Sequence, residues 1–447
     1  MTANGDATSM LGALLEKASS AGADGADAVI MHGISLGVSY RLGKPEDLER
    51  SEGRDLGLRV LLGRRQAMVS TTDFTEEALD ALVERALAMA RAVPEDPYCG
   101  LVEPEQLARE WPDLELADGR EPDADQLIDW ARRAEEAARA VPGVTNSEGG
   151  DAGWSLSRAA LATSGGFAGG YETSRFSFSV SVLAGEDTGM ERDYDWSSAC
   201  FEEDLDSPEE IGKRAGERAV SRLNPRKAAS GSVPVVYDPR VSGGLVRHLA
   251  GAISGASVAR GTSFLKDRLN QPVLAPGIDV IDDPHRKRGL RSRPFDGEGA
   301  ATAARHIIEN GTLATWLLDS RSARQLNLRT TGHAARGTNG PPQPSPSNLY
   351  LAPGQMSPRE LMADIESGLY VTELIGMGVN GVTGDYSRGA AGFWIDKGEI
   401  AWPVSELTVA GNLTEMFAHL TAADDLTFRH GIDAPTLRVD GMTVAGQ

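Results

Sequence analysis

The sequence predicts an α+β protein, in which a helix-flanked N-terminal α/β domain is followed by a largely antiparallel β C-terminal domain. Hydrophobic residues alternate with serines in the segment 174–185, which is typical of a strand with one buried and one wet face. Helical periodicity marks residues 73–93 and 123–140. Three strand-like runs lie towards the end of the chain: 369–377, 392–395 and 399–411.

Five helices are expected from periodicity and capping: 8–20, 73–93, 123–140, 207–223 and, more weakly, 240–253. The helix at 73–93 is the clearest, because Glu76 and Glu77 fall in its first turn and Arg91 in its last, as the helix dipole favours. Thr8 or Ser9 is the expected N-cap of the first helix.

Strands are expected at 28–40 and at 56–69, the latter a hairpin broken at Gly63 and Arg64. A second hairpin is expected at 305–316, where Asn310 and Gly311 supply the turn. The short polar segment 227–231 is the best candidate boundary. It divides the chain into an N-terminal α+β domain, 1–228, and a β-rich C-terminal domain, 229–447.

Composition limits the classes of partner. The chain has 447 residues and a net charge of −21, and its longest basic run is the triplet 286–288. A nucleic-acid or anionic membrane surface calls for a basic face, so neither is an expected partner, and very acidic peptides should be repelled at long range. Two cysteines, Cys99 and Cys200, are too few for a disulfide framework. No signal peptide or transmembrane segment is recognisable, so we expect a cytoplasmic protein.

Motifs for catalysis are largely missing. No histidine is followed by Glu, and the closest histidine pair, His419 and His430, is too widely spaced for a helical zinc site, which leaves only a metal site assembled from distant segments. Ser387 lies in a glycine-flanked segment with the wrong spacing for a nucleophile elbow. The glycine-rich block 376–392 has two interpretations: a peptide- or partner-contacting loop, or a system of tight turns.

The run that begins at Gly376 and continues through GVTGDYSRGAAGFWIDKGEIAWP resembles the TldD/TldE family, also known as modulators of DNA gyrase, and more narrowly its TldE (PmbA) branch. Three further segments agree with the resemblance: 57–79, 235–265 and 310–337. The resemblance implies a two-domain architecture. It also implies a cytoplasmic heterodimer with a TldD-like catalytic subunit, which cleaves unfolded peptides and matures some ribosomal peptides such as microcins.

In the catalytic branch, the central helix carries a His-Glu-x-x-x-His metal motif. Here the matching positions are His248, Leu249 and Ile253, and no cysteine or histidine lies between 376 and 394. A single imidazole cannot hold zinc, and leucine cannot take a proton from bound water. We therefore expect no metal in this chain, zinc in the TldD-like partner, and a structural or groove role for His248.

Three hypotheses follow. In the first, the chain is a non-catalytic subunit whose residues Gly384, Asp385, Ser387, Gly389 and Gly392 contact the peptide or the partner, with backbone available for strand addition. In the second, it is a stand-alone hydrolase that uses Asp385 and Ser387 or scattered histidines. In the third, it is a homodimeric binding or modulating protein without a proteolytic role.

Overall fold

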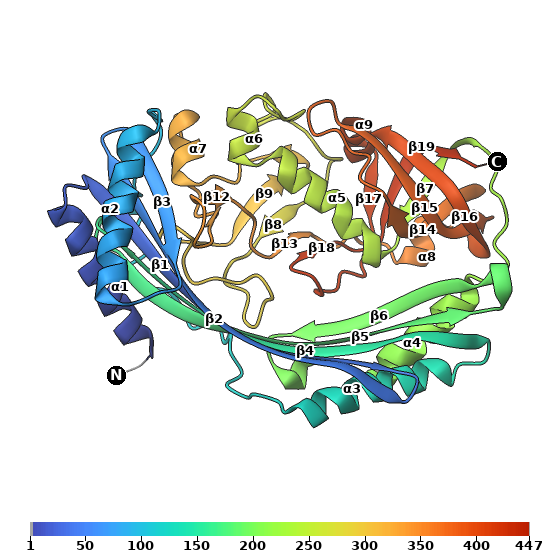
Figure 1. Ribbon diagram of the computed structural model, residues 1–447. Coiled ribbons are helices and arrows are strands. Elements are labelled where there is room, and N and C mark those ends of the chain that lie inside the picture. Colours follow the sequence, from blue (N-terminus) through green and yellow to red (C-terminus); the bar gives the residue numbers. More distant parts are fainter. Residues whose placement is uncertain (1–2, 447) are drawn as a thin grey trace.

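The computed structural model describes residues 3–446, and its N-terminal half is built on one long antiparallel sheet of order β3-β2-β1-β4-β5-β6 (Figure 1). Hairpins join β1 to β2, β2 to β3, β4 to β5 and β5 to β6. The two groups of strands meet where β1 pairs with β4, with Asp27 opposite Thr163 and Tyr40 opposite Gly150. Its strands are β1 (Gly25–Arg41), β2 (Lys44–Leu62), β3 (Arg65–Thr71), β4 (Val144–Thr163), β5 (Ala168–Ala184) and β6 (Glu191–Ala199). The hairpin expected at 56–69 is confirmed, with Leu56 opposite Thr71 and Leu62 opposite Arg65, and β2 extends beyond it to pair with β1.

The curved sheet has helices on its outer side and the C-terminal half of the chain on its concave side (Figure 1). The alternation predicted in β5 is confirmed: Phe176, Phe178, Val180 and Val182 are at most 2% exposed. They pack beneath α3 and α4, whereas the serines between them lie on the concave face. The other end of the sheet is covered by α1 and α2.

The four helices of the sheet lie where they were predicted, apart from the start of the first. They are α1 (Ala3–Ser20), α2 (Glu76–Ala92), α3 (Ala124–Arg139) and α4 (Pro208–Ser221). Asp123 and Ser207 cap α3 and α4 through their side chains. The predicted start of the first helix at residue 8 is wrong, because the helix already includes Ala3 and the hydroxyls of Thr8 and Ser9 bond back to the carbonyl of Gly5.

The C-terminal half contains a second six-stranded sheet of order β16-β15-β14-β7-β19-β17. A further pairing of β16 with β19 closes five of these strands into a ring around the largest hydrophobic core. The β7–β14 pair is parallel and the other pairs are antiparallel. The strands are β7 (Gly231–Tyr237), β14 (Ser367–Ile375), β15 (Asp385–Asp396), β16 (Glu399–Asn412), β17 (Leu420–Ala422) and β19 (Leu437–Ala445).

A smaller sheet, β10-β9-β8-β13-β18, lies between this ring and the N-terminal sheet (Figure 1). Asn310, with φ 47°, turns the predicted hairpin between β9 and β10. The strands are β8 (Val280–Asp282), β9 (Arg305–Glu309), β10 (Thr312–Leu313), β13 (Leu349–Leu351) and β18 (Ile432–Asp433), with a separate pair β11 (Ala334–Ala335) and β12 (Gln343–Pro344). The helices are α5 (Pro239–Ala252), α6 (Gly255–Ala259), α7 (Ser320–Gln325), α8 (Pro358–Met362) and α9 (Leu413–Ala418).

The proposed boundary at 228/229 falls between α4 and β7. Within residues 3–446, no helix has the length and apolar character needed to cross a membrane.

Candidate functional site

The three positions of the degenerate metal motif lie on or next to α5. This helix follows β7 directly, and the side chain of Asp238 caps it by accepting a hydrogen bond from the backbone N–H of Arg240 at 2.9 Å. Leu249 is 1% exposed and Ile253 is 0% exposed, and both belong to the main C-terminal core. The side chains that replace an acid and an imidazole are therefore ordinary packing residues.

His248 lies on a different side of α5, half-buried against β15. Its ring meets the ring of Tyr386 edge-on, with centroids 6.0 Å apart. Burial, followed by the charges of Arg388 and Arg247, lowers the pKa of His248. Two guanidinium groups beside the one remaining imidazole oppose the binding of a divalent cation. Among residues 3–446, no three His, Cys, Asp or Glu side chains are grouped so that they could hold a metal ion. The residues present do not fit zinc.

The glycine-rich block divides into a folded-back loop and the first half of β15. Ser387 donates its backbone N–H to the carbonyl of Gly378 at 2.7 Å, and Asn380 donates to Asp385 at 2.8 Å. The start of the strand-like run predicted at 392–395 is wrong, because β15 already begins at Asp385, within the block. The loop covers one side of this strand and β16 pairs with the other, so the block offers no free edge for the addition of a peptide strand.

Local geometry requires glycine at some positions of the block. Gly384 has φ +81°, a conformation that favours glycine. A Cβ at Gly392 would overlap the carbonyl oxygen of Tyr370 on β14. Gly389 faces Ile375 in ordinary contact. The tight-turn interpretation of the block therefore holds, whatever else the loop contacts.

Asp385 and Ser387 do not meet His248. They are exposed and alternate along β15 with Tyr386, which is buried and faces α5. The carboxylate of Asp385 accepts hydrogen bonds from Thr383 at 2.6 Å and Asn412 at 3.2 Å, and these bonds lower its pKa. Within residues 3–446, no hydrogen bond joins the side chain of Ser387 to a His, Asp or Glu, so Asp385 and Ser387 are not arranged as a catalytic pair.

The loop of the glycine-rich block carries an apolar surface that the sequence did not single out. Ile375, Met377 and Val382 are 60%, 92% and 56% exposed, respectively. Exposed large hydrophobic residues that are grouped in this way are typical of protein contact surfaces. A signal for them existed in the sequence, namely apolar residues placed among glycines that cannot build a core around them.

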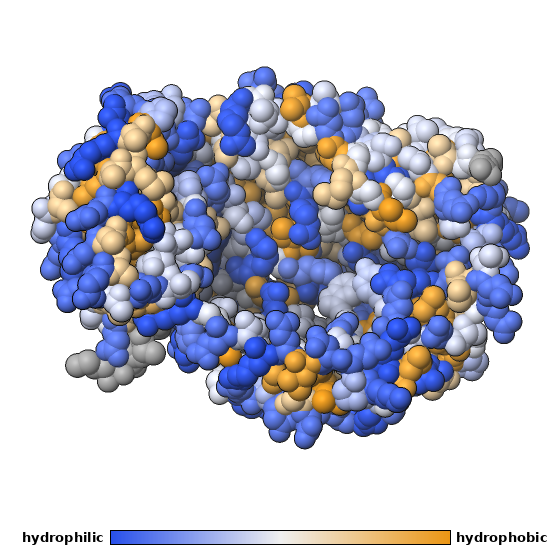
Figure 2. Space-filling model, viewed as in Figure 1, coloured by the Kyte–Doolittle hydropathy of each residue, from blue (hydrophilic) through white to orange (hydrophobic). Residues whose placement is uncertain are grey.

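A second feature emerges only from the tertiary structure: two cavities on the concave face of the N-terminal sheet. One, of about 550 Å³, lies over β4, β5 and β6 and is closed by Leu290, Arg429 and His430. The other, of about 430 Å³, lies over β1, β4 and β5 and is closed by residues 291–293, Ala335 and residues 345–346. Because segment 290–293 is a wall of both, we call them together the central groove. Figure 2 shows a hollow at the centre of the molecule, between the N-terminal sheet and the C-terminal half.

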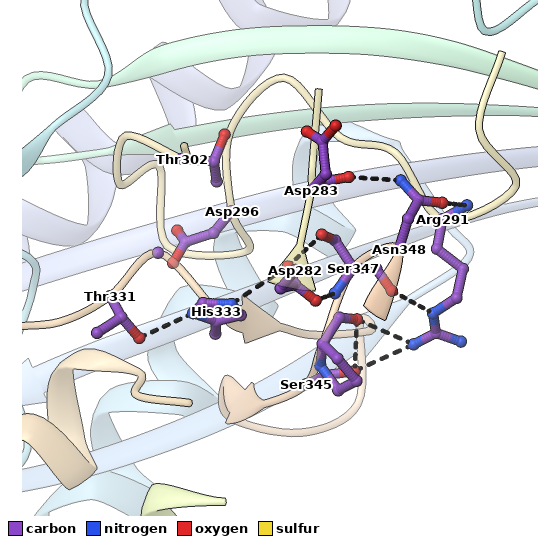
Figure 3. Close-up of polar contacts among 12 residues, drawn as sticks. Asp282, Asp283, Arg291, Asp296, Thr302, Thr331, His333, Ser345, Ser347 and Asn348 are labelled. Atoms are coloured by element: carbon purple, nitrogen blue, oxygen red, sulfur yellow. Dashed lines mark hydrogen bonds and ion pairs between the residues drawn. The ribbon is translucent and has the colours of Figure 1, made fainter. Parts of the chain in front are cut away.

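A buried polar network fixes the C-terminal wall of the central groove (Figure 3). His333 lies between Thr331, 2.8 Å from its Nδ1, and Asp282, 3.3 Å from its Nε2. Burial would raise the pKa of Asp282, but hydrogen bonds from His333 and Ser347 keep it below its usual value. Thr331, His333 and Asp282 are all at most 7% exposed. Their hydrogen bonds therefore stabilise the fold, and the Thr331 hydroxyl is not accessible to a substrate as a nucleophile.

Comparison with known proteins agrees with this architecture. Three family models match the chain: PmbA/TldA metallopeptidase domain 1 at 26–90, the central domain at 117–223 and the C-terminal domain at 230–446. Metalloprotease PmbA of Escherichia coli O157:H7 is 39% identical over 426 residues, covering 95% of this chain and 93% of that protein. The chain belongs to the PmbA/TldD family. A PmbA homologue of Haemophilus influenzae is 37% identical, covering 97% and 94%.

Solved structures of PmbA/TldD type share the whole fold. A Bacteroides thetaiotaomicron protein described as a candidate modulator of DNA gyrase superposes with TM-score 0.90 at 26% identity, covering 98% of both chains. TldE from Thermococcus kodakarensis superposes with TM-score 0.88 at 20% identity, covering 98% of this chain and 100% of that one, which shows the likeness of fold alone. Within this PmbA/TldD fold, α5 and β15 bring His248 to Tyr386.

Proposed function

We propose that this chain is the non-catalytic subunit of a TldD/TldE-type cytoplasmic metallopeptidase complex that degrades or matures unfolded peptides. The observation that carries the proposal is the state of the motif positions. Leu249 and Ile253 are sealed in the core, and Arg247 and Arg388 act on the remaining imidazole. In this proposal zinc belongs to a TldD-like partner, which supplies the activated water.

The loop of the glycine-rich block is the proposed partner contact. Its exposed residues Ile375, Met377 and Val382 would gain from burial against another protein, and the adjoining β15 holds the loop in place through backbone hydrogen bonds. In the same proposal, Gly384, Gly389 and Gly392 serve the contact indirectly, by allowing the loop and strand to take this shape.

The first test compares the lone chain with a complex. Purified alone, the chain should contain no zinc by elemental analysis and should hydrolyse no unstructured peptide. Co-expressed with a TldD-like chain that has an intact His-Glu-x-x-x-His motif, it should co-purify in a complex with zinc-dependent, chelator-sensitive peptidase activity. Chelator-sensitive turnover by the lone chain would overturn the proposal. Recovery of a homodimer that binds no TldD-like chain would favour a modulating protein instead.

The second test concerns the contact surface. Met377→Asp should reduce co-purification with the TldD-like chain, because it places a charge in a surface that must be desolvated. Met190→Asp is the matched control, since Met190 is 46% exposed and lies outside the loop. Equal recovery of both variants would remove the loop from the interface.

A further inference from the structure

The concave face of the N-terminal sheet is lined by small and hydroxyl side chains. Gly33 and Ser157 line one cavity of the central groove, and Gly153, Ser177 and Ser179 line the other. Such side chains leave room for an extended chain above the sheet and present hydroxyl groups to its backbone. Many hydrophobic side chains of these strands, such as Phe176 and Val180, point the other way, into the helices. Met31, Tyr171 and Trp196 are exceptions that line the two cavities.

The charge of the central groove is opposite to that of the whole chain. The protein carries −21 overall, yet arginines line the groove together with one carboxylate, Asp151, which accepts a hydrogen bond from Ser39 at 2.7 Å. Two of these arginines are neutralised: Arg158 pairs with Glu172 and Arg429 with Asp195. Among the described residues, the other arginines that line the groove, Arg175, Arg291 and Arg293, form no ion pair with a carboxylate.

The guanidinium groups of two arginines from different parts of the chain, Arg175 and Arg291, lie where the two cavities join. Arg175 on β5 donates one long hydrogen bond to the carbonyl of Leu290, at 3.4 Å. Arg291 follows directly in the opposite wall, and Arg247 on α5 acts electrostatically on both Arg291 and His430. Within residues 3–446, none of the three arginines forms an ion pair with Asp or Glu.

The polar network of Figure 3 holds Arg291 in position. Its Nε donates to the carbonyl of Ser347 at 3.2 Å, and its Nη2 donates to the carbonyl of Pro346 at 3.1 Å. The side chain of Asn348 accepts from the backbone N–H of Arg291 at 3.0 Å. Burial, followed by Arg293 and Arg247, lowers the pKa of Arg291 although Asp282 acts in the opposite sense. A fixed guanidinium among like charges, with donors to spare, is preorganised to receive an anion.

We propose that the central groove binds carboxylate-bearing segments of an extended peptide through Arg175 and Arg291, with Arg247 on α5 as a further positive charge near Arg291. The inference rests on the proposed function, since it specifies which unfolded peptides the complex prefers: those with clustered Asp or Glu side chains, or with a free C-terminal carboxylate near the bound segment. It reverses the expectation, drawn from the net charge, that very acidic peptides are repelled. Within a concave site, the electrostatic field of the residues that line it outweighs that of the distant surface. A nucleic acid is disfavoured, since a long polyanion would also face the acidic surface outside the groove.

The test measures binding by the lone full-length chain, with fluorescence anisotropy and labelled unstructured peptides of equal length. The probes are a neutral peptide with an amidated C-terminus, the same peptide with a free carboxylate, an amidated peptide with a glutamate run, and single-stranded DNA. Arg175 and Arg247 are exposed, so their replacement by glutamine leaves the core intact. Arg329→Gln is the matched control, at an exposed arginine that lines neither cavity.

We expect the carboxylate-bearing peptides to bind more tightly than the neutral amidated one. The variant Arg175→Gln with Arg247→Gln should weaken their binding by about tenfold or more, and added salt should weaken it further. Arg329→Gln should bind like the unaltered chain. Comparison of the free-carboxylate and glutamate peptides shows which carboxylate supplies the affinity. Equal binding of acidic and neutral peptides, an unaffected double variant, or tighter binding of DNA would each overturn the inference.

Failure of this inference is separable from failure of the proposed function. If the complex with a TldD-like chain cleaves the neutral peptide but the groove shows no carboxylate preference, only the inference falls. If acidic peptides bind through the arginines but no complex with peptidase activity can be formed, the proposed function falls and the binding site remains.

Discussion

The carboxylate of Asp27 on β1 is ion-paired with the guanidinium of Arg336, 309 positions later in the chain. Asp27 also accepts from Arg59 on β2, and all three side chains are at most 5% exposed. Burial would raise the pKa of Asp27, but the two arginines hold it below its usual value. The pair thus connects the N-terminal sheet to the loop that follows β11.

This buried pair should dominate the attachment of the C-terminal half to the sheet. Arg336→Ala leaves the carboxylate with one partner, and Asp27→Asn leaves two buried guanidinium groups without a counter-charge. Each should lower the free energy of unfolding by about 3–5 kcal/mol, measured by urea denaturation. Arg359→Gln removes a pair with 83% and 67% exposed side chains and should cost less than about 1 kcal/mol. Similar losses for the buried and exposed pairs would contradict the assignment.

Glu298 should make stability depend on pH in an unusual direction. It is 3% exposed and accepts from the backbone N–H of Ser320, and burial with the neighbouring Asp296 raises its pKa from 4.5 to about 7. A raised carboxyl pKa contributes stability that is complete below pH 4.5 and is lost as pH rises through 7.

Glu298→Gln keeps the acceptor and removes the titration. Relative to the unaltered chain, the variant should gain up to about 3 kcal/mol between acidic and alkaline pH. The measurement is urea unfolding of both proteins over this range, taken as a difference so that other titrating groups cancel. Parallel profiles for the two proteins would show that the pKa of Glu298 is the same in the folded and unfolded states, which would contradict the prediction.

The backbone of β14 approaches Gly392 closely. Replacing this glycine by alanine should therefore change stability much more than replacing Gly381 in the same block. Gly392→Ala places a methyl group against the carbonyl of Tyr370 and should destabilise the protein by about 1–3 kcal/mol. Gly381→Ala has open space around it and should be close to neutral. Thermal unfolding of both variants checks this, and a neutral Gly392→Ala would mean that β14 and β15 can move apart without cost.

Introducing the residues of the His-Glu-x-x-x-His motif into α5 should not create a metal site. Leu249→Glu together with Ile253→His places polar groups in the core and leaves Arg247 and Arg388 nearby. We expect a loss of about 3 kcal/mol or more in the free energy of unfolding. Zinc should not recover it, as urea unfolding with and without the metal would show. Gly251→Ala, on the exposed side of the same helix with open space around it, is the control. Stabilisation of the double variant by zinc would refute the prediction.

Much of the fold could be read from local patterns. The alternation at Phe176 and Phe178 located a strand and its buried face, and Asp123 and Ser207 located two helix starts. The same patterns misplaced the start of α1 and the beginning of β15. The side-chain hydroxyls of Thr8 and Ser9 can form hydrogen bonds within a helix as well as cap its start. Glycine occurs both in paired strands and in loops, so a glycine-rich sequence does not show where β15 begins.

The sequence by itself determined that Leu249 and Ile253 of the α5 segment cannot bind a metal ion. Their side chains have no ligand atoms, wherever the helix lies in the fold. Only the tertiary structure decided what faces the hollow of the sheet. Periodicity tells which side of a strand avoids water, but not which distant segment lies opposite its wet side. Arg175 and Arg291 are far apart in the sequence and lie close together because of the tertiary fold. Such a contact depends on the path of the whole chain rather than on any local run of residues.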